Sequence, residues 1–192
     1  MPAGLTQLQV ANRSLVEIAR ALPLASGNVA SNFDGSTNGI AAAIEYPGAV
    51  ELLLRQQDFE FSRRVAALTL SGNAAPLGWA YEFLYPTDCM KIRQVVPATW
   101  PLNDPQATRW DVGTSVVSAA QTTVIWTNAA NAVLTYTTSN VTETNWDPAF
   151  TEQFVRYLGS ILALPVAGRP DFAEKMLGIA GRLGAANQDK DS

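Results

Sequence analysis

The chain of 192 residues contains no histidine. Histidine is the commonest general base and metal ligand in proteins, so its absence removes every serine–histidine and cysteine–histidine dyad. A single cysteine, Cys89, excludes an internal disulfide and a zinc site built on paired thiolates. The sequence also has no P-loop and no glycine-rich dinucleotide motif after a strand. We therefore expect a protein that is not an enzyme and needs no cofactor or metal.

Carboxylate-pair catalysis, as in glycoside hydrolysis, is the enzyme chemistry that this composition leaves open. The carboxylates that could be proposed for it are Glu45, Glu51, Asp88, Asp111 and Glu152. Each has the sequence context of a helix surface, a turn or a cap. A hydrolase acting on cell-wall material is therefore kept as an alternative that ranks below a non-enzymatic role.

Charge is also scarce. Charged residues make up 16% of the chain, whereas about 25% is usual in soluble domains. The net charge is −4 and the basic residues are dispersed, with Arg63–Arg64 the only adjacent pair, so no electropositive surface for nucleic acid is predicted. No uncharged apolar run is long enough to span a membrane, and no signal peptide is predicted. Scarce charge is typical of a chain that hides much of its surface against copies of itself.

Apolar spacing predicts two helices in the first third of the chain. Over residues 6–22 apolar side chains recur every three or four positions, and Pro23 ends the pattern. A second helix is expected over residues 36–57, after a Gly-, Asn- and Ser-rich loop. Its apolar stripe consists of Ile40, Ile44, Val50 and Leu54. Pro47 lies inside this helix and cannot donate to residue 43, so we expect a kink or a restart there.

The middle of the chain has the pattern of strands. Residues 62–70 alternate as a strand does, and residues 71–88 are expected to form an extended connection. Four β-rich runs follow, at residues 90–96, 108–112 with an extension toward 117, 122–127 and 132–138. The segment Asn128–Asn131 between the last two runs predicts a β-hairpin.

Helical spacing returns after residue 145. Asp147 is a suitable N-cap and Pro148 a natural first helical residue. The apolar face of this helix is expected to consist of Phe150, Phe154, Tyr157, Ile161 and Leu164. Pro165 and Gly168 are expected to end it. A last helix then begins at residues 170–171, with a stripe made of Phe172, Met176, Ile179 and Leu183.

The order helix, helix, strands, helix, helix predicts an α+β fold. Helices from the two ends of the chain must pack together, because each has an apolar face and no other partner. We predict a discontinuous helical bundle of residues 1–70 and 145–183 with an inserted antiparallel β-lobe of residues 71–144. Residues 184–192 are small, polar and charged, and are expected to form a flexible C-terminal tail.

Aromatic residues gather in and around the predicted β-lobe. They are Trp79, Tyr81, Phe83, Tyr85, Trp100, Trp110 and Trp126. Their alternation over residues 79–85 predicts one face of an extended segment packed on the bundle. The alternative is an exposed sugar-binding platform. The protein would then be a monomeric accessory binding module, recognising carbohydrate or acting like a chaperone.

Three blocks of sequence resemble, in the same order, the tail tubular protein A-like head-to-tail adaptors of tailed bacteriophages. The first block spans residues 44–64, the second 78–93 and the third 136–150. The positions that carry the resemblance are Tyr46, Arg55, Phe59, Phe61, Trp79, Tyr85, Pro86, Asp88, Trp146, Asp147 and Pro148. One departure is Ser62, where the family has alanine. The first helix and the C-terminal end match in character only.

The resemblance implies a structural virion protein located at the head–tail interface and assembled in the host cytoplasm. It implies a homo-oligomeric ring of about twelve copies, docked on the portal protein on one side and on the tail nozzle or tail tube on the other. DNA would pass through the central channel. The C-terminal segment would reach into the portal, and its residues proposed for docking are Gly184, Asn187, Asp189, Lys190 and Asp191. An acidic wall suits such a conduit, because it does not hold the phosphate backbone.

Overall fold

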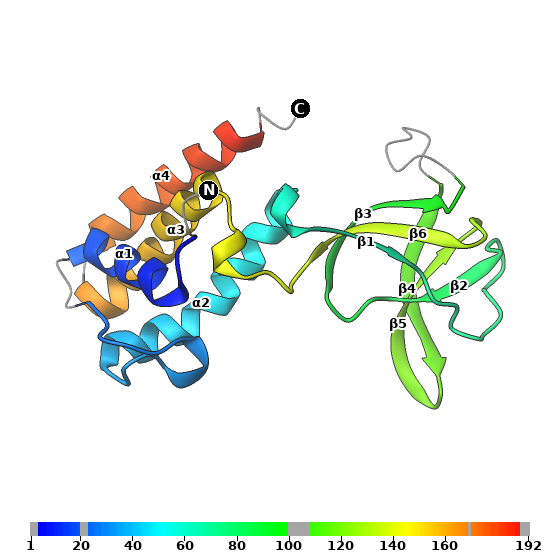
Figure 1. The fold of residues 1–192 in the computed structure, drawn as a ribbon, viewed down its shortest axis with the longest axis horizontal. Coiled ribbons are helices and arrows are strands. Elements are labelled where there is room, and N and C mark those ends of the chain that lie inside the picture. The colour runs from blue at the N-terminus through cyan, green and yellow to red at the C-terminus, as the bar shows by residue number, and fades with distance from the viewer. Residues whose placement is uncertain (1–3, 20–22, 100–107, 169, 189–192) are drawn as a thin grey trace. The chain divides into compact units, whose positions relative to one another are not determined.

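The computed structural model describes residues 4–19, 23–99, 108–168 and 170–188. The chain forms two compact units, which we call the helical unit (residues 1–61 and 141–192) and the β-lobe (residues 62–140) (Figure 1). The predicted α+β class, with helices from both ends and an inserted antiparallel lobe, is confirmed. The units divide at 61/62 and 140/141 rather than at the predicted 70/71 and 144/145, because the first strand pairs inside the lobe.

In its described residues the helical unit has four α-helices, and α3 is in contact with the other three. Their bounds are α1 Gln7–Ala19, α2 Thr37–Gln56, α3 Pro148–Ala167 and α4 Pro170–Gln188. Short 3-10 helices lie at η1 Val29–Ser31, η2 Glu60–Ser62 and η3 Glu143–Asn145. Since α3 is covered on several sides, its buried residues extend well beyond one stripe, and Leu158 and Leu162 are fully buried. The predicted face of α3 was partly wrong, because Leu164 is exposed.

The start of α3 follows the prediction closely. Asp147 is the N-cap, and its Oδ1 accepts a hydrogen bond of 2.7 Å from the backbone N–H of Phe150. Pro148 is the first helical residue, where its missing N–H costs no intrahelical bond. The end of α3 differs. The helix continues through Pro165 to Ala167, and Gly168 caps it in the left-handed conformation that glycine tolerates best.

Helix α2 departs from the prediction in two respects. It runs without interruption through Pro47, so the expected restart is wrong. Its buried face carries small residues and Tyr46, whereas Ile40 and Ile44 of the predicted stripe are exposed. The buried positions of α2 are Gly39, Ala42, Ala43, Tyr46, Ala49, Leu53 and Leu54. Small side chains allow α2 to approach α3 closely, which leaves the isoleucines on the outside.

The predicted C-terminal tail is partly wrong. Residues 184–188 continue α4, and Gly184 is buried. A Cβ added at Gly184 would lie 2.7 Å from the side-chain nitrogen of Gln153 and 2.8 Å from that of Gln57. This close approach places Gly184 in the packing of the helical unit. Asp189, Lys190 and Asp191 lie outside the described residues, as do the side chain of Asn187, Trp100 and Leu22.

Outside residues 100–107, the β-lobe folds into two antiparallel three-stranded sheets, with strand orders β1-β6-β3 and β2-β5-β4. The strands are β1 Arg63–Ala67, β2 Tyr81–Leu84, β3 Cys89–Pro97, β4 Trp110–Val117, β5 Ala120–Thr127 and β6 Ala132–Thr138. Strand β2 lies inside the predicted extended connection. Backbone bonds join the sheets at their edges. Leu84 N–H donates to Thr69 C=O at 2.8 Å on one side, and Thr108 N–H donates to Val95 C=O at 3.2 Å on the other.

The predicted hairpin between residues 122–127 and 132–138 is wrong. Strands β5 and β6 belong to different sheets, and the segment 128–131 carries the chain from one sheet to the other. Strands β4 and β5 form a hairpin, whose two-residue turn is Ser118–Ala119. Both turn residues have positive φ, 51° and 67°, as the tight turn of a two-residue hairpin requires.

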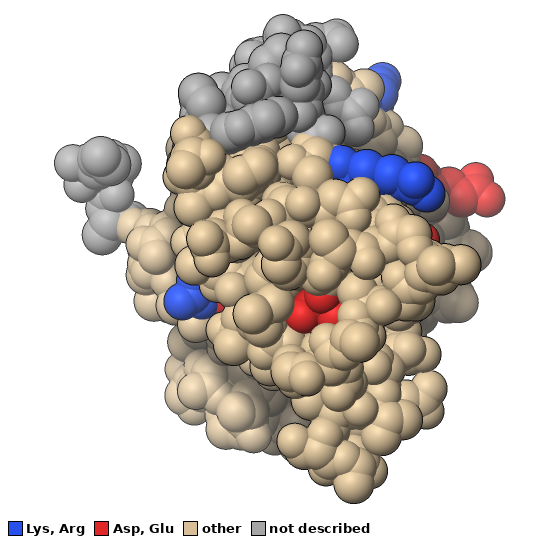
Figure 2. All heavy atoms as spheres, turned by 90° about the vertical axis from the view of Figure 1, so that its right-hand side faces the viewer, with Lys and Arg blue, Asp and Glu red and all other residues tan. Residues whose placement is uncertain are grey.

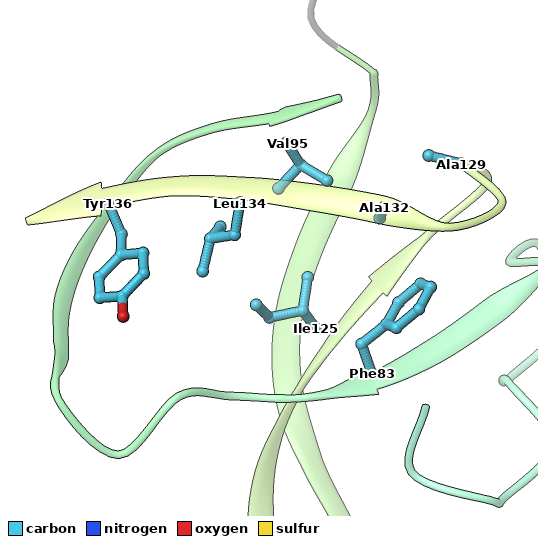
Figure 3. Packing of buried hydrophobic residues seen from close by; sticks show 7 residues of the cluster. All are labelled: Phe83, Val95, Ile125, Ala129, Ala132, Leu134 and Tyr136. Atoms are coloured by element: carbon cyan, nitrogen blue, oxygen red, sulfur yellow. The ribbon is translucent and has the colours of Figure 1, made fainter. Parts of the chain in front are cut away.

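The core of the lobe lies between its two sheets (Figure 3). Phe83 and Ile125 come from one sheet, and Val95, Leu134 and Tyr136 from the other. Tyr81, Tyr85 and Trp110 pack against this cluster. Tyr81, Phe83 and Tyr85 therefore serve the lobe's own core, and their expected packing on the bundle is wrong.

Candidate functional site

The first and third sequence blocks meet in an aromatic cluster of the helical unit. Tyr46 of α2 lies with its ring centroid 4.9 Å from that of Phe154 and 6.4 Å from that of Trp146. Phe59 lies 4.7 Å from Phe150 in an edge-to-face arrangement. Phe61 lies 5.0 Å from Phe150, and Trp146 lies 4.8 Å from it. These positions join α2 to α3, and pairs of this geometry add to the stability that burial provides.

A carboxylate holds the outer end of this cluster. Glu143 Oε1 accepts hydrogen bonds from the Tyr46 hydroxyl at 3.2 Å and from Gln7 Nε2 at 2.8 Å. Burial, followed by the negative charge of Glu143, raises the pKa of Tyr46 well above its ordinary value. Tyr46 therefore stays a hydrogen-bond donor across the physiological range. The result is a fixed junction between the start of α1, the middle of α2 and η3.

Trp146 contributes its ring to the cluster but not its N–H group. Its Nε1 atom is buried and is the one such side-chain atom in the described part of the chain without a hydrogen-bond partner. The residue also borders a surface hollow of about 840 Å³, whose polar lining includes Arg13, Asp147 and Glu152. Because Nε1 has almost no solvent-accessible surface, a ligand in that hollow could not reach it without rearrangement.

The second sequence block builds a polar junction in the β-lobe around Asp88. Its Oδ1 accepts from the Tyr136 hydroxyl at 3.0 Å. Its Oδ2 accepts from Thr138 Oγ1 at 2.7 Å and from Arg64 Nη1 at 2.6 Å. The Asp88 backbone C=O also accepts from Ser139 N–H at 2.8 Å. Asp88 thus ties the β2–β3 connection to β1 and β6.

Titration of this junction follows from its contacts. Burial alone would raise the pKa of Asp88, but the hydrogen bonds from Thr138, Tyr136 and Arg64 hold that pKa below its ordinary value. Burial, together with the hydrogen bond to Asp88, raises the pKa of Tyr136 to about 12. At neutral pH the pair is therefore a carboxylate and a neutral phenol. That is the combination in which each hydrogen bond has one donor and one acceptor.

Sequence reasoning missed a second carboxylate of the lobe, Glu82. It is buried on β2 and accepts from Ser71 Oγ at 2.7 Å, Trp126 Nε1 at 2.9 Å and Asn73 Nδ2 at 3.3 Å. Burial would raise its pKa, but these donors outweigh burial and lower the pKa. The sequence signal for this site was Glu82 itself, an acidic residue between the aromatic residues Tyr81 and Phe83.

The remaining positions of the resemblance are Arg55, Trp79, Tyr85 and Pro86. Arg55 pairs with Glu51 one helical turn earlier on the surface of α2, at 2.8 Å. The Trp79 ring carries the Arg109 guanidinium 4.7 Å from its centroid. Tyr85 and Pro86 are half-buried at the end of β2. Tyr81 and Trp110 are half-buried against the lobe core, and the half-buried Trp126 donates its Nε1–H to Glu82.

The carboxylates considered for catalysis are divided between the two units: Glu45, Glu51 and Glu152 belong to the helical unit, and Asp88 and Asp111 to the β-lobe. Glu152 on α3 pairs with Arg13 of α1 at 2.7 Å and with Arg156 at 2.9 Å, and Arg156 also pairs with Glu17. Within the described ranges, no group of three His, Cys, Asp or Glu residues could hold a metal ion. No helix in the described part of the chain is long and apolar enough to cross a membrane.

The surface of the helical unit carries several large apolar side chains. Ile44 is 68% exposed, and Ile40 lies one turn earlier on the same side of α2. The others are Val16 on α1, Leu52 on α2, Leu164 on α3 and Leu177 on α4. Single exposed apolar residues are ordinary, but Ile40, Ile44 and Pro47 follow one another at helical spacing.

Comparison with known proteins adds no relative: neither a family model nor a curated protein matches the sequence.

Proposed function

We propose that this chain is a structural protein of a tailed-phage virion. It would form a ring that joins the portal to the tail and lines part of the DNA conduit. The observation that carries the proposal is the resemblance of three sequence blocks, in order, to head-to-tail adaptors. Its support in the fold is that most positions of these blocks have structural roles. Tyr46, Phe59 and Trp146 pack the helical unit, Asp147 caps α3, and Asp88 ties the lobe together.

The surface of α2 supports ring formation. Ile40 and Ile44 are exposed although they belong to an apolar sequence pattern, because the buried face of α2 carries small residues together with Tyr46. Burying a side chain of this size against a neighbouring copy would contribute roughly 1.5–3 kcal/mol. An outward apolar stripe on a chain with few charges is what a subunit contact requires.

The charge distribution supports a conduit rather than a DNA-binding protein. The chain carries 17 acidic and 13 basic residues, and several of the arginines are paired with carboxylates. Association with DNA depends on the number of phosphates neutralised by cationic side chains. A wall without an unpaired basic cluster allows DNA to slide.

The C-terminal segment that we propose for portal docking is shorter than residues 184–192. Gly184 is buried against Gln57 and Gln153, so it belongs to the helical unit and is not a docking residue. The proposal now concerns the end of α4 and residues 189–192. A chain lacking 189–192 is therefore the informative truncation, because removal of 184–192 would also remove packing.

Sedimentation of the purified chain, alone and with the portal protein of the same phage, tests the proposal. We expect a ring, and we expect Ile44→Asp to lower its yield while the circular dichroism spectrum stays unchanged. Thr37→Asp is the matched control, because Thr37 is exposed on the same helix but lies at its favourable N-terminal end. A wild-type chain that stays monomeric with and without portal protein would refute the adaptor proposal.

A further inference from the structure

The β4–β5 hairpin extends past the rest of its sheet. Strand β5 pairs with β4 from Ala120 to Thr127, but β2 covers it only from Val124 to Thr127. The part nearer the turn is therefore a two-stranded ribbon. A two-stranded hairpin by itself is marginally stable in water, because it has no third strand and no covered face.

Both strands of this ribbon have an edge that β2 does not cover, β5 over residues 120–122 and β4 along its outer side. Val117 and Ala120 flank the two-residue turn, so they form a hydrogen-bonded pair, and the antiparallel alternation then turns the backbone groups of Val112, Thr114 and Val116 away from β5. Two of these outward groups are occupied locally. Val112 N–H donates to Asp111 Oδ1 at 2.8 Å, and Val116 C=O accepts from Asn73 Nδ2 at 2.9 Å.

Thr114 lies between these two occupied positions. Within the described part of the chain, its outward N–H and C=O groups have no hydrogen-bond partner. The flanking side chains Val112 and Val116 are 39% and 66% exposed. The edge therefore offers one main-chain N–H and one C=O, those of Thr114, between two exposed apolar side chains. An added β-strand recognises this combination of main-chain groups and alternate side chains.

Several other strand edges of the lobe are paired or guarded. Residues 69–71 bond to β2, and Thr108 bonds to β3. Strand β1 carries Arg63 and Arg64, which are exposed, and charged side chains are a common protection of edge strands. The segment from Val112 to Ile125, by contrast, contains no charged residue and no proline. This edge lacks the protection that β1 has.

The chemistry of the edge fits a second copy of the same chain. Each copy carries a net charge of −4, so two copies repel each other wherever their charged faces meet. The uncharged ribbon avoids this repulsion. The face drawn in Figure 2 likewise carries few charged side chains. A partner of opposite charge would gain nothing from this edge, whereas another neutral strand gains a main-chain ladder.

We propose that the edge of β4 around Thr114 receives an extended strand from a neighbouring copy, so that adjacent subunits of the ring share a continuous sheet. This inference rests on the proposed ring. It adds that part of the subunit contact is a main-chain hydrogen-bond ladder in the β-lobe, separate from the apolar stripe of α2.

Three variants of Thr114 test the pairing in the full chain. Thr114→Pro removes an outward N–H that takes no part in the β4–β5 ladder, and its ring fixes φ at position 114 near about −65°. Thr114→Lys keeps the N–H and adds the kind of charge that guards edges. Thr114→Val, which keeps both the N–H and the shape, is the matched control. We expect the proline and lysine variants to need a protein concentration at least about tenfold higher for half-assembly, and the valine variant to match wild type.

Sedimentation measures the assembly, and hydrogen exchange of the Thr114 amide is compared between assembled and dissociated wild-type protein. Protection of that amide in the assembled form, with weaker assembly of the proline and lysine variants, supports the strand pairing. Wild-type assembly of both variants would overturn the pairing and leave the adaptor proposal intact. A wild-type chain that never assembles would overturn both. If the proline variant misfolds, the lysine variant decides.

Discussion

Replacing Asp88 by alanine should lower the free energy of unfolding of the β-lobe by more than the removal of a surface ion pair would. The carboxylate accepts three side-chain hydrogen bonds, two of them from the hydroxyls of Tyr136 and Thr138, which belong to buried residues. Leaving a buried donor without a partner costs roughly 1–3 kcal/mol. Since the Asp88 side chain is 24% exposed, water can satisfy part of this demand. We expect a loss of about 2–3 kcal/mol in the free energy of unfolding of the lobe.

Arg64→Ala is the matched comparison. It removes the third partner of the same carboxylate, but the arginine side chain is 52% exposed. Exposed ion pairs contribute about 0–1 kcal/mol, so the arginine variant should cost less than about 1 kcal/mol. The difference in free energy of unfolding between the two variants gives the contribution of the buried hydroxyl hydrogen bonds without that of the ion pair.

Native-state hydrogen exchange of the β6 amides is the appropriate assay, because it reports on the lobe even when the helical unit unfolds separately. Urea titration followed by tryptophan fluorescence provides an independent value. The reasoning is refuted if Asp88→Ala costs no more than Arg64→Ala, since the hydroxyls would then be satisfied without the carboxylate.

Three further predictions concern other residues. Asp147→Ala should destabilise the helical unit by about 1 kcal/mol in urea titrations while Asp147→Asn stays close to wild type, because the asparagine oxygen still caps α3; equal losses would contradict the cap. Gly113→Ala should destabilise the lobe by about 1–3 kcal/mol, because the added Cβ would lie 2.1 Å from the Trp126 ring; unchanged tryptophan fluorescence and melting would contradict that contact. The pKa of Tyr136 is raised, so its contribution is complete below the ordinary tyrosine pKa and is lost as pH rises through about 12; Tyr136→Phe should remove this alkaline loss in pH-dependent melting, and its persistence would assign the loss elsewhere.

The parts of the fold that could be predicted are those set by local chemistry. Asp147 followed by Pro148 specifies a helix start whatever surrounds it, because both act on the first turn alone. The choice of the buried face of α2 is not local. That helix has isoleucines on one side and small residues with Tyr46 on the other, and the distance to α3 decides which side is inside.

Strand pairing was the weakest part of the prediction. The segment 128–131 has the composition of a hairpin turn, but Ala129 and Ala132 are buried where the chain crosses between sheets. The real turn, Ser118–Ala119, contains neither glycine nor asparagine, so its positive φ values had no signal in the sequence. Glu82 was missed for a related reason, because its partner Trp126 lies on β5, far along the chain.

Electron microscopy of the purified chain, alone and mixed with portal rings from the same phage, tests the central claim most directly. We predict rings, or added ring density at the narrow end of the portal. In these rings the β-lobes of neighbouring subunits should be close enough for a strand of one copy to pair with β4 of the next. A chain that stays monomeric while the portal rings remain bare would contradict it.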